Sequence, residues 1–245
     1  LAAEWIWAEK GPAGALVSLA RAGTPVGILL RRYLRWRYGA DLPHYTISII
    51  RGRGIDRNAM DYILARHQRS DIQFVDGWTG KGAIQRQLNE AMADYPGVDP
   101  SLAVLSDPAC VAGKYGTRDD LLIASSCLNA TISGLLSRTF LRRDIIGERD
   151  FHGAVFYQEL RDRDLTYQFI GEIEGRFRVP TAPPGGGTEP WGAGLEEVRE
   201  ISRTFRVEDI NLIKPSIGEA TRVQLRRVPW KILAADLADE EGLGH

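Results

Sequence analysis

The sequence predicts an α/β fold with three layers, in which a mostly parallel sheet lies between two layers of helices. Three observations lead to this prediction. Apolar segments of strand length alternate with amphipathic segments of helix length as far as Phe140. Most of these strands run into a turn that is rich in glycine or polar residues. The interval between strands leaves room for a helical crossover, which parallel strands require.

The composition is that of a globular protein with ample core. The 245 residues include 31 Lys+Arg and 32 Asp+Glu, so the net charge favours neither bulk nucleic-acid binding nor a membrane surface. No apolar stretch is long enough to cross a bilayer, and we expect no membrane partner. Two cysteines, Cys110 and Cys127, fit a reducing compartment, so we expect a cytoplasmic protein. No Cys/His spacing is typical of zinc, and we expect no structural metal.

The expected elements form five strand-and-turn units. The strands are expected at 14–20, 45–50, 72–75, 102–106 and 121–124. Helices are expected at 26–38, 58–67 and 82–95, and again after the fifth turn as far as residue 140. Pro25 is placed to start the first helix, and Asp56 or Asn58 is available to cap the second.

The turns after the first two strands carry cations. Arg21-Ala-Gly-Thr-Pro25 follows the first strand, and Arg51-Gly-Arg-Gly54 follows the second. Ligands bind beyond the carboxyl ends of parallel strands, and guanidinium groups bind phosphate with two hydrogen bonds. We therefore predict an anion site that includes Arg21, Gly23, Thr24, Arg51 and Arg53, although a solvated turn would also explain Arg51 and Arg53.

The third strand ends in the stretch with the clearest chemistry. It delivers one carboxylate, Asp76, into a glycine-rich turn made of Gly77, Trp78, Thr79, Gly80, Lys81 and Gly82. Glycines let backbone N–H groups approach phosphate oxygens, and the following helix offers its positive end. The turn lacks the spacing of a Walker A loop, so it predicts a phosphate cradle without predicting a nucleoside triphosphatase.

Two later turns supply further candidates. Asp107 follows the fourth strand, and the fifth strand is followed by Ser125, Ser126, Cys127 and Asn129. The polar residues of the fifth turn have two readings, helix capping and hydrogen bonding to a ligand. Cys127 lies at a predicted helix start, which lowers the pKa of a thiol, but a nucleophile also needs a base. His152 could serve as that base, whereas His44 precedes a strand and is interpreted as structural.

The C-terminal part has a different character. After a mixed region that could cap the sheet, the Pro- and Gly-rich segment 179–190 interrupts all periodicity. A charged helix is expected at 195–205, and then a basic helix with Arg222, Arg226 and Arg227 precedes a strand at 230–234. The predicted division is a domain at 1–178, a linker and helix at 179–204, and a small α/β element at 205–245.

Taken together, the first three units resemble type I phosphoribosyltransferases, and two of their turns resemble loops of that family. Ile72 to Val75, Asp76 and the Thr79-Gly80 pair match the phosphoribose loop in outline, and Arg21 to Pro25 resembles the pyrophosphate loop. Gly77 stands where that family has a second acid. The resemblance implies a fold of that kind, and it implies binding of phosphoribosyl pyrophosphate (PRPP) together with Mg²⁺. It also implies catalytic roles for Asp76, Arg51 and Arg53, PRPP contacts from the first and third turns, and acceptor contacts from Asp107 and the fifth turn.

Longer segments are similar to a narrower family. These segments are His44 to Asp56, Phe74 to Ile84, Gly116 to Asp120, Ser125 to Gly134 and Asp150 to Gly153. They resemble the phosphoribosyltransferase-like proteins of bacterial tellurite-resistance and stress operons, some of which are labelled the cysteine protease StiP family. In that family an RNA-binding module of the Pelota and L7Ae type commonly follows, and Ile213 to Arg222 looks like its start.

The resemblance implies three alternative functions. The first is an enzyme that binds PRPP or a nucleotide and makes or breaks an N-glycosidic bond in a stress-response setting. The second is a sensor that binds a phosphoribosyl ligand without turnover and acts through an RNA-binding element. The third is a peptidase that uses Cys127. The sequence does not identify the acceptor or base.

Overall fold

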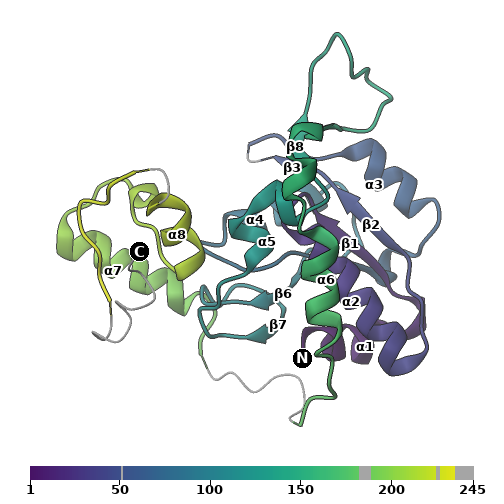
Figure 1. Cartoon of the computed structure of the whole chain (residues 1–245), viewed down its shortest axis with the longest axis horizontal. Helices are drawn as coiled ribbons and strands as arrows, with labels where there is room; N and C mark the ends of the chain where they lie inside the picture. The colour runs from purple at the N-terminus through teal and green to yellow at the C-terminus, as the bar shows by residue number, and fades with distance from the viewer. Residues whose placement is uncertain (51, 182–188, 225–226, 235–245) are drawn as a thin grey trace.

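A computed structural model describes residues 1–50, 52–181, 189–224 and 227–234. Its centre is a five-stranded sheet in which every neighbouring pair is parallel (Figure 1). The strands are β1 (Ala15–Leu19), β2 (His44–Ile47), β5 (Ile72–Val75), β6 (Leu102–Ser106) and β7 (Lys114–Thr117). The predicted α/β class with a mostly parallel sheet is therefore confirmed.

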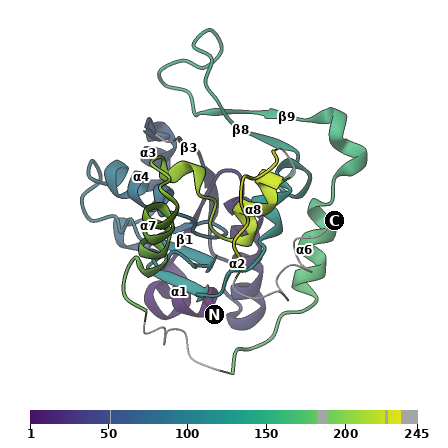
Figure 2. The ribbon, with the colours of Figure 1, turned by 90° about the vertical axis from the view of Figure 1, so that its left-hand side faces the viewer.

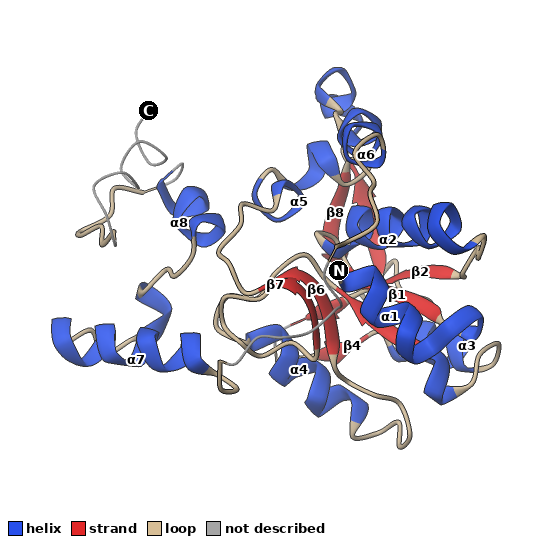
Figure 3. Cartoon of the chain, turned by 90° about the horizontal axis from the view of Figure 1, so that it is seen from below, coloured by secondary structure: helices blue, strands red, loops and turns tan. Residues whose placement is uncertain are grey.

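Helices cover both faces of this sheet. The four helices are α1 (Ala2–Lys10), α2 (Gly23–Tyr38), α3 (Arg57–Leu64) and α4 (Ala83–Met92). Val17 and Phe74 belong to the buried cluster that contains side chains of α3 and α4, while Leu16 belongs to the cluster that contains side chains of α1 and α2. Figure 3 shows α2 and α4 on opposite sides of the strands. Alternate strand residues thus supply the two cores, as the pleat requires.

The strand order predicts a ligand-binding crevice at the β1/β5 boundary. The order is β2-β1-β5-β6-β7, so the chain leaves β1 toward one edge and returns to extend the sheet on the other side. Crossovers on either side of such a reversal run to opposite faces, so the crossover helices themselves do not cover the carboxyl ends of the two central strands. The first and third predicted turns follow β1 and β5, and they therefore meet at this point.

The remaining elements lie outside the central sheet. They are the antiparallel pair β3 (Ile49–Ile50) and β4 (Gly54–Ile55), the antiparallel pair β8 (Leu136–Phe140) and β9 (Gly153–Phe156), and the helices α5 (Ala124–Cys127), α6 (Thr166–Glu174), α7 (Ala193–Phe205) and α8 (Ile217–Gln224). Short 3-10 helices span Gly11–Ala13, Arg69–Asp71, Asn129–Ile132, Gln158–Arg163 and Ile210–Leu212. Figure 2 shows β8 and β9 as an extended ribbon beyond the helices.

Three expected elements are wrong. The predicted strand at 121–124 does not form, because the sheet ends at β7, Leu121 is half exposed and α5 begins at Ala124. The predicted helix up to residue 140 ends early, because Gly134 and Leu135 both have positive φ and β8 then pairs with β9. The predicted strand at 230–234 has no partner strand among the described residues, and Trp230 is 81% exposed.

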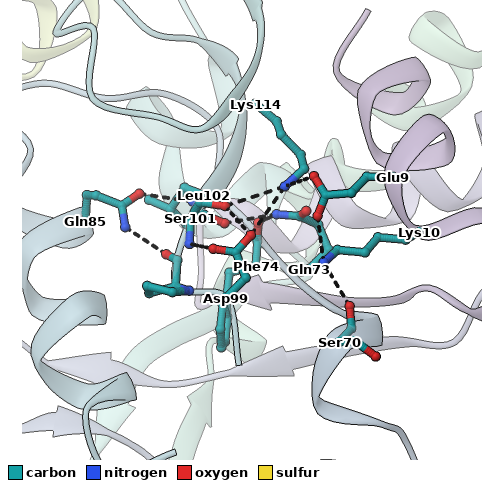
Figure 4. Close-up of polar contacts among 11 residues, drawn as sticks. Glu9, Lys10, Ser70, Gln73, Phe74, Gln85, Asp99, Ser101, Leu102 and Lys114 are labelled. Carbon is teal, nitrogen blue, oxygen red and sulfur yellow. Dashed lines mark hydrogen bonds and ion pairs between the residues drawn. The ribbon is translucent and has the colours of Figure 1, made fainter. Parts of the chain in front are cut away.

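A buried lysine fixes α1 to the amino-terminal edge of the sheet (Figure 4). Lys114 begins β7, and its ammonium lies 2.9 Å from Glu9 of α1 and 3.6 Å from Asp99. Asp99 also accepts hydrogen bonds from the backbone and hydroxyl of Ser101. A buried cation needs such partners, because desolvation without them is costly. This network lies at the start of the strands, away from the crevice.

Close packing of α2 on the sheet gives the first testable prediction. A Cβ on Gly27 would lie 2.0 Å from Ser18 Oγ and 2.3 Å from His44 Nε2, which are themselves hydrogen-bonded at 2.7 Å. We expect Gly27→Ala to lower the free energy of unfolding by about 2 kcal/mol, because the core must move to admit the methyl group. Urea denaturation followed by circular dichroism measures this change.

Gly171→Ala is the matched control for this substitution. Gly171 also lies within a helix, α6, but a Cβ there would meet no atom within 4 Å. We expect it to be neutral or to stabilise by up to about 1 kcal/mol, because alanine favours the helix. Equal stability changes in the two variants would contradict the packing argument.

Candidate functional site

The turns after β1 and β5 are in direct contact. A Cβ on Gly23 would lie 2.7 Å from the carbonyl oxygen of Val75 and 3.4 Å from Asp76 Oδ1. A side chain at residue 23 would therefore separate the two turns, so glycine is required for this approach. The structure thus brings the predicted Arg21–Pro25 turn against the predicted carboxylate.

Asp76 has the character of a site residue. It follows β5 directly, and its Oδ1 accepts a hydrogen bond of 2.8 Å from the backbone N–H of Gly77. Burial raises the pKa of Asp76 to about 7, although the Gly77 bond and the charge of Arg138 oppose this rise. A carboxyl group with a raised pKa at the mouth of a crevice is typical of ligand sites.

The ribbon strand β8 adds a cation that the sequence analysis missed. Arg138 lies on β8 and acts electrostatically on Asp76. Arg21 donates a hydrogen bond of 2.8 Å to the carbonyl oxygen of Leu136, which places β8 beside the β1 turn. Arg138 was overlooked because its segment was expected to be helical. The segment Leu136 to Phe140 carries three polar residues in a row between two apolar ones, so it has no local strand signal.

The glycine-rich turn begins as an extension of β5. The Thr79 N–H donates to the carbonyl oxygen of Ser106 at 3.2 Å, and the Gly77 carbonyl accepts from Leu105 at 3.0 Å, so this part still pairs with β6. Gly82, at φ +66°, then starts α4. The first backbone N–H groups of a helix have no partner within the helix, so the N-terminal turn of α4 keeps the character of an anion cradle.

Asp107 is a buried carboxylate at the carboxyl end of β6, where several turns of this edge of the sheet meet. It is fully buried and accepts hydrogen bonds from the Thr79 hydroxyl, the Arg118 guanidinium, and the backbone N–H groups of Val111 at 3.1 Å and Ala112 at 2.9 Å. Contact between Asp107 and a base stays a prediction, as does donation from Thr79 to a phosphate. A base bound to Asp107 would have to replace one of these donors, and a phosphate bound to the Thr79 hydroxyl would have to replace Asp107 as its acceptor.

The other side of the glycine-rich turn is covered by the C-terminal part of the chain. Lys81 Nζ donates to the carbonyl oxygen of Ile213 at 2.8 Å and pairs with Glu219 of α8 at 3.0 Å. The indole of Trp78 lies between Gly80 and Gly218. Trp78 thus packs between the glycine-rich turn and α8.

The fifth turn packs on the third. Ser126 Oγ would lie 2.9 Å from a Cβ on Gly77, and the Cys127 thiol donates to the carbonyl oxygen of Gly218 at 3.6 Å. Ser125 Oγ is buried and has no hydrogen-bond partner among the described residues. The side chain of Asn129 lies outside the described part of the structure. The predicted ligand contacts of this turn stay predictions.

The second predicted turn lies in a hairpin rather than at the end of a central strand. Gly52 donates its N–H to Gln87 Oε1 at 2.6 Å, which fixes the β3–β4 hairpin to α4. Arg53 is exposed in this hairpin, and Arg51 lies outside the described residues. Their contact with a shared ligand stays a prediction.

The two histidines considered as possible bases for Cys127, His44 and His152, have distinct environments. His44 bonds to Ser18, and burial lowers the pKa of His44 to about 4, which fits the structural role expected for it. His152 Nδ1 lies 3.0 Å from Ser48 Oγ, and its backbone N–H donates to Asp56 at 2.6 Å. These contacts place His152 beside the segment that joins β2 to β3, whereas Cys127 contacts α8.

Comparison with known proteins assigns a family. The family model described as "Tellurite-like stress resistance cysteine protease StiP" matches residues 1–174. The chain belongs to the StiP family. A relative named "Cysteine protease StiP", from Acinetobacter baylyi, is 38% identical over 246 aligned residues, which cover 92% of this chain and 63% of the relative. A second model, the Pelota RNA-binding domain, matches residues 192–245.

These findings support part of the sequence-based expectation. The StiP family and the Pelota-type segment are confirmed, while the phosphoribosyltransferase fold and ligand stay predictions. Among the described residues of this StiP-family chain, no group of three or more His, Cys, Asp and Glu side chains is arranged to hold a metal ion. None of the described helices is long and apolar enough to cross a membrane.

The raised pKa of Asp76 predicts a pH-dependent stability. Because the folded state raises this pKa from 3.8 to about 7, the favourable contribution is complete below pH 4 and is lost as the pH rises through 7. Asp76→Asn should therefore gain stability over the wild type between pH 4 and pH 8, by roughly 2–4 kcal/mol. Urea denaturation at several pH values measures the difference.

Asp144→Asn provides the control for this pH series. Asp144 is exposed, and its hydrogen bond with Arg142 lowers the pKa of that carboxyl. Its titration is complete at lower pH, so the stability difference should stay constant from pH 5 to pH 8. A flat profile for the Asp76 variant as well would contradict the burial argument.

Proposed function

We propose that the crevice between the β1 and β5 turns binds PRPP or a nucleotide, and that the protein makes or breaks the N-glycosidic bond of that ligand. The observation that carries the proposal is the contact of Gly23 with Asp76, which joins two turns of phosphate-binding character at the reversal of strand order. Arg21 of the β1 turn and Arg138 of β8 bring positive charge to this point, and Lys81 lies on the glycine-rich turn that follows Asp76. Such an arrangement suits a ligand with two anionic ends and a ribose between them.

Each residue then has a role that its position supports. The N-terminal turn of α4, with Gly80 to Gly82 and Lys81, would hold the 5′-phosphate. Arg21 and the backbone of Gly23 would hold the pyrophosphate or the second anionic group. Asp76 would accept hydrogen bonds from the ribose hydroxyl groups. The reaction passes through an oxocarbenium-like state, so fixing both ends of the ligand and neutralising the leaving group supply the catalysis.

The site offers Mg²⁺ a single carboxylate ligand, that of Asp76. Mg²⁺ is commonly held by one or two carboxylates together with ligand phosphates, and Asp76 can supply one carboxylate. Burial raises the pKa of Asp76, so a cation at this position would stabilise the charged form of the carboxyl group. When bound, Mg²⁺ would neutralise charge on the pyrophosphate. Arg21 and Lys81 would orient the anionic groups from the protein side.

Two observations favour the sensor as a second candidate. Gly77 stands beside Asp76, so this turn has a single acid in the position where the phosphoribosyltransferase loop has two. The segment from residue 192 matches an RNA-binding domain, which is compatible with RNA as an output partner. Among the arginines expected to face RNA, Arg227 is exposed, while the side chains of Arg222 and Arg226 lie outside the described residues.

Ligand binding tests the primary proposal. We expect wild-type protein to bind PRPP in the presence of Mg²⁺, and Lys81→Ala to bind it about tenfold more weakly, since a charged hydrogen bond contributes about 1.5 kcal/mol. Isothermal titration calorimetry measures both affinities. Lys10→Ala is the matched control, because Lys10 pairs with Glu9 and Ser70 away from the crevice.

Release of pyrophosphate separates the enzyme from the sensor. An enzyme should release it when an acceptor is supplied, whereas a sensor should bind PRPP with no release. Equal affinity in the wild type, Lys81→Ala and Lys10→Ala would overturn the placement of the phosphate.

A peptidase is a third candidate because both the family description and the relative carry the name cysteine protease. Cys127 contacts Gly218 of α8, whereas His152 contacts Ser48. On the primary proposal, Cys127→Ala should keep its PRPP affinity within about twofold, because the thiol does not hold the ligand. Hydrolysis of a casein substrate by the wild type that is lost in Cys127→Ala would establish the peptidase instead.

A further inference from the structure

The first turn of α8 is docked on the residues that form the proposed phosphate site. Asp120 Oδ2 accepts a hydrogen bond of 2.6 Å from the backbone N–H of Ile217, which is the first residue of α8. Gly218 contacts Trp78 and the thiol of Cys127. Two separate segments of the N-terminal part therefore hold α8 against the glycine-rich turn.

Glu219 places a carboxylate where a bound anion would be expected. Its Oε2 lies 3.0 Å from Lys81 Nζ, and it would lie 3.7 Å from a Cβ on Gly80. The side chains of Lys81 and Glu219 are 12% and 21% exposed, so the pair is partly shielded from solvent. An ion pair in such a position is stronger than one on an open surface. A phosphate that uses Lys81 must displace this carboxylate.

We propose that α8 is an internal latch, in which Glu219 occupies Lys81 until a phosphorylated ribose ligand displaces it and releases α8 from the glycine-rich turn. This inference rests on the proposed function. It connects ligand binding to the Pelota-type segment, because α8 lies within the residues that match that domain. Coupling of this kind is reciprocal, so the factor by which docking of α8 weakens ligand binding is also the factor by which the ligand weakens docking of α8.

The docking of α8 can be measured without a ligand. Cys127 is 7% exposed and its thiol lies against Gly218, so release of α8 should expose it to N-ethylmaleimide. Peptide mapping by mass spectrometry distinguishes Cys127 from Cys110, which lies beside Gly192 and serves as an internal reference. We expect Glu219→Gln to increase the labelling rate of Cys127 several-fold and to leave that of Cys110 unchanged.

Two further variants test whether the labelling of Cys127 reports on the docking of α8. Asp120→Asn weakens the hydrogen bond at the start of α8 without changing the residues of the glycine-rich turn, so it should act in the same direction. Glu196→Gln is the matched control, because Glu196 of α7 pairs with Arg199 and Arg203 on its own helix. Unchanged labelling of Cys127 in both Glu219→Gln and Asp120→Asn would overturn the latch.

Titration with PRPP and Mg²⁺ tests the coupling itself. We expect Glu219→Gln to bind PRPP about fivefold more tightly than the wild type, and PRPP to accelerate labelling of Cys127 in the wild type. If PRPP binds both proteins equally, or protects Cys127, the latch is wrong while the proposed function stands. If PRPP binds neither protein, the proposed function fails and the latch fails with it.

Discussion

The buried carboxylate of Asp107 is the interaction on which the carboxyl edge of the sheet depends. It joins the Thr79 hydroxyl, the turn that contains Val111 and Ala112, and the Arg118 guanidinium, which also lies 3.8 Å above the ring of Tyr115. A buried carboxylate without such donors would cost several kcal/mol. All of these segments must therefore be in place together. The glycine-rich turn is consequently held by its neighbours rather than by its own flexible residues.

The contact between α5 and the glycine-rich turn explains why Asp76 has no acidic neighbour. A Cβ on Gly77 would lie 2.9 Å from Ser126 Oγ and 3.0 Å from Ile123 Cγ2, so a side chain at residue 77 would require these neighbours to shift. The close packing of α5 thus takes the space that a second carboxylate would need. Asp76 is therefore the single carboxylate of this turn that can bind the ribose or a cation. Burial raises the pKa of Asp76 to about 7. Ligand binding and ionisation of Asp76 are therefore coupled, because a cation at the site would stabilise the charged form.

Features that depend on local sequence, such as turns and helix caps, could be predicted from the sequence. Features that depend on contacts between distant segments could not. The turns after β1, β5 and β6 were placed from glycine, proline and apolar periodicity, and the Asp56 cap of α3 was among the two alternatives given. The ribbon containing Arg138 was missed, because β8 depends on pairing with β9 and its residues alone do not favour a strand over a helix. The contact of Glu219 with Lys81 joins residues far apart in the chain. No local pattern could have indicated it.

The strength of the latch follows from the geometry of this ion pair. Glu219 also lies 3.7 Å from Lys214 on its own segment, so its charge remains partly compensated after it leaves Lys81. The pair with Lys81 is partly shielded, and its rupture should cost about 1 kcal/mol rather than the several kcal/mol of a buried pair. A ligand phosphate can therefore displace Glu219 without losing most of its binding energy. The same small cost limits the coupling to a few-fold, so ligand binding shifts the position of α8 by degree and does not act as an all-or-none switch.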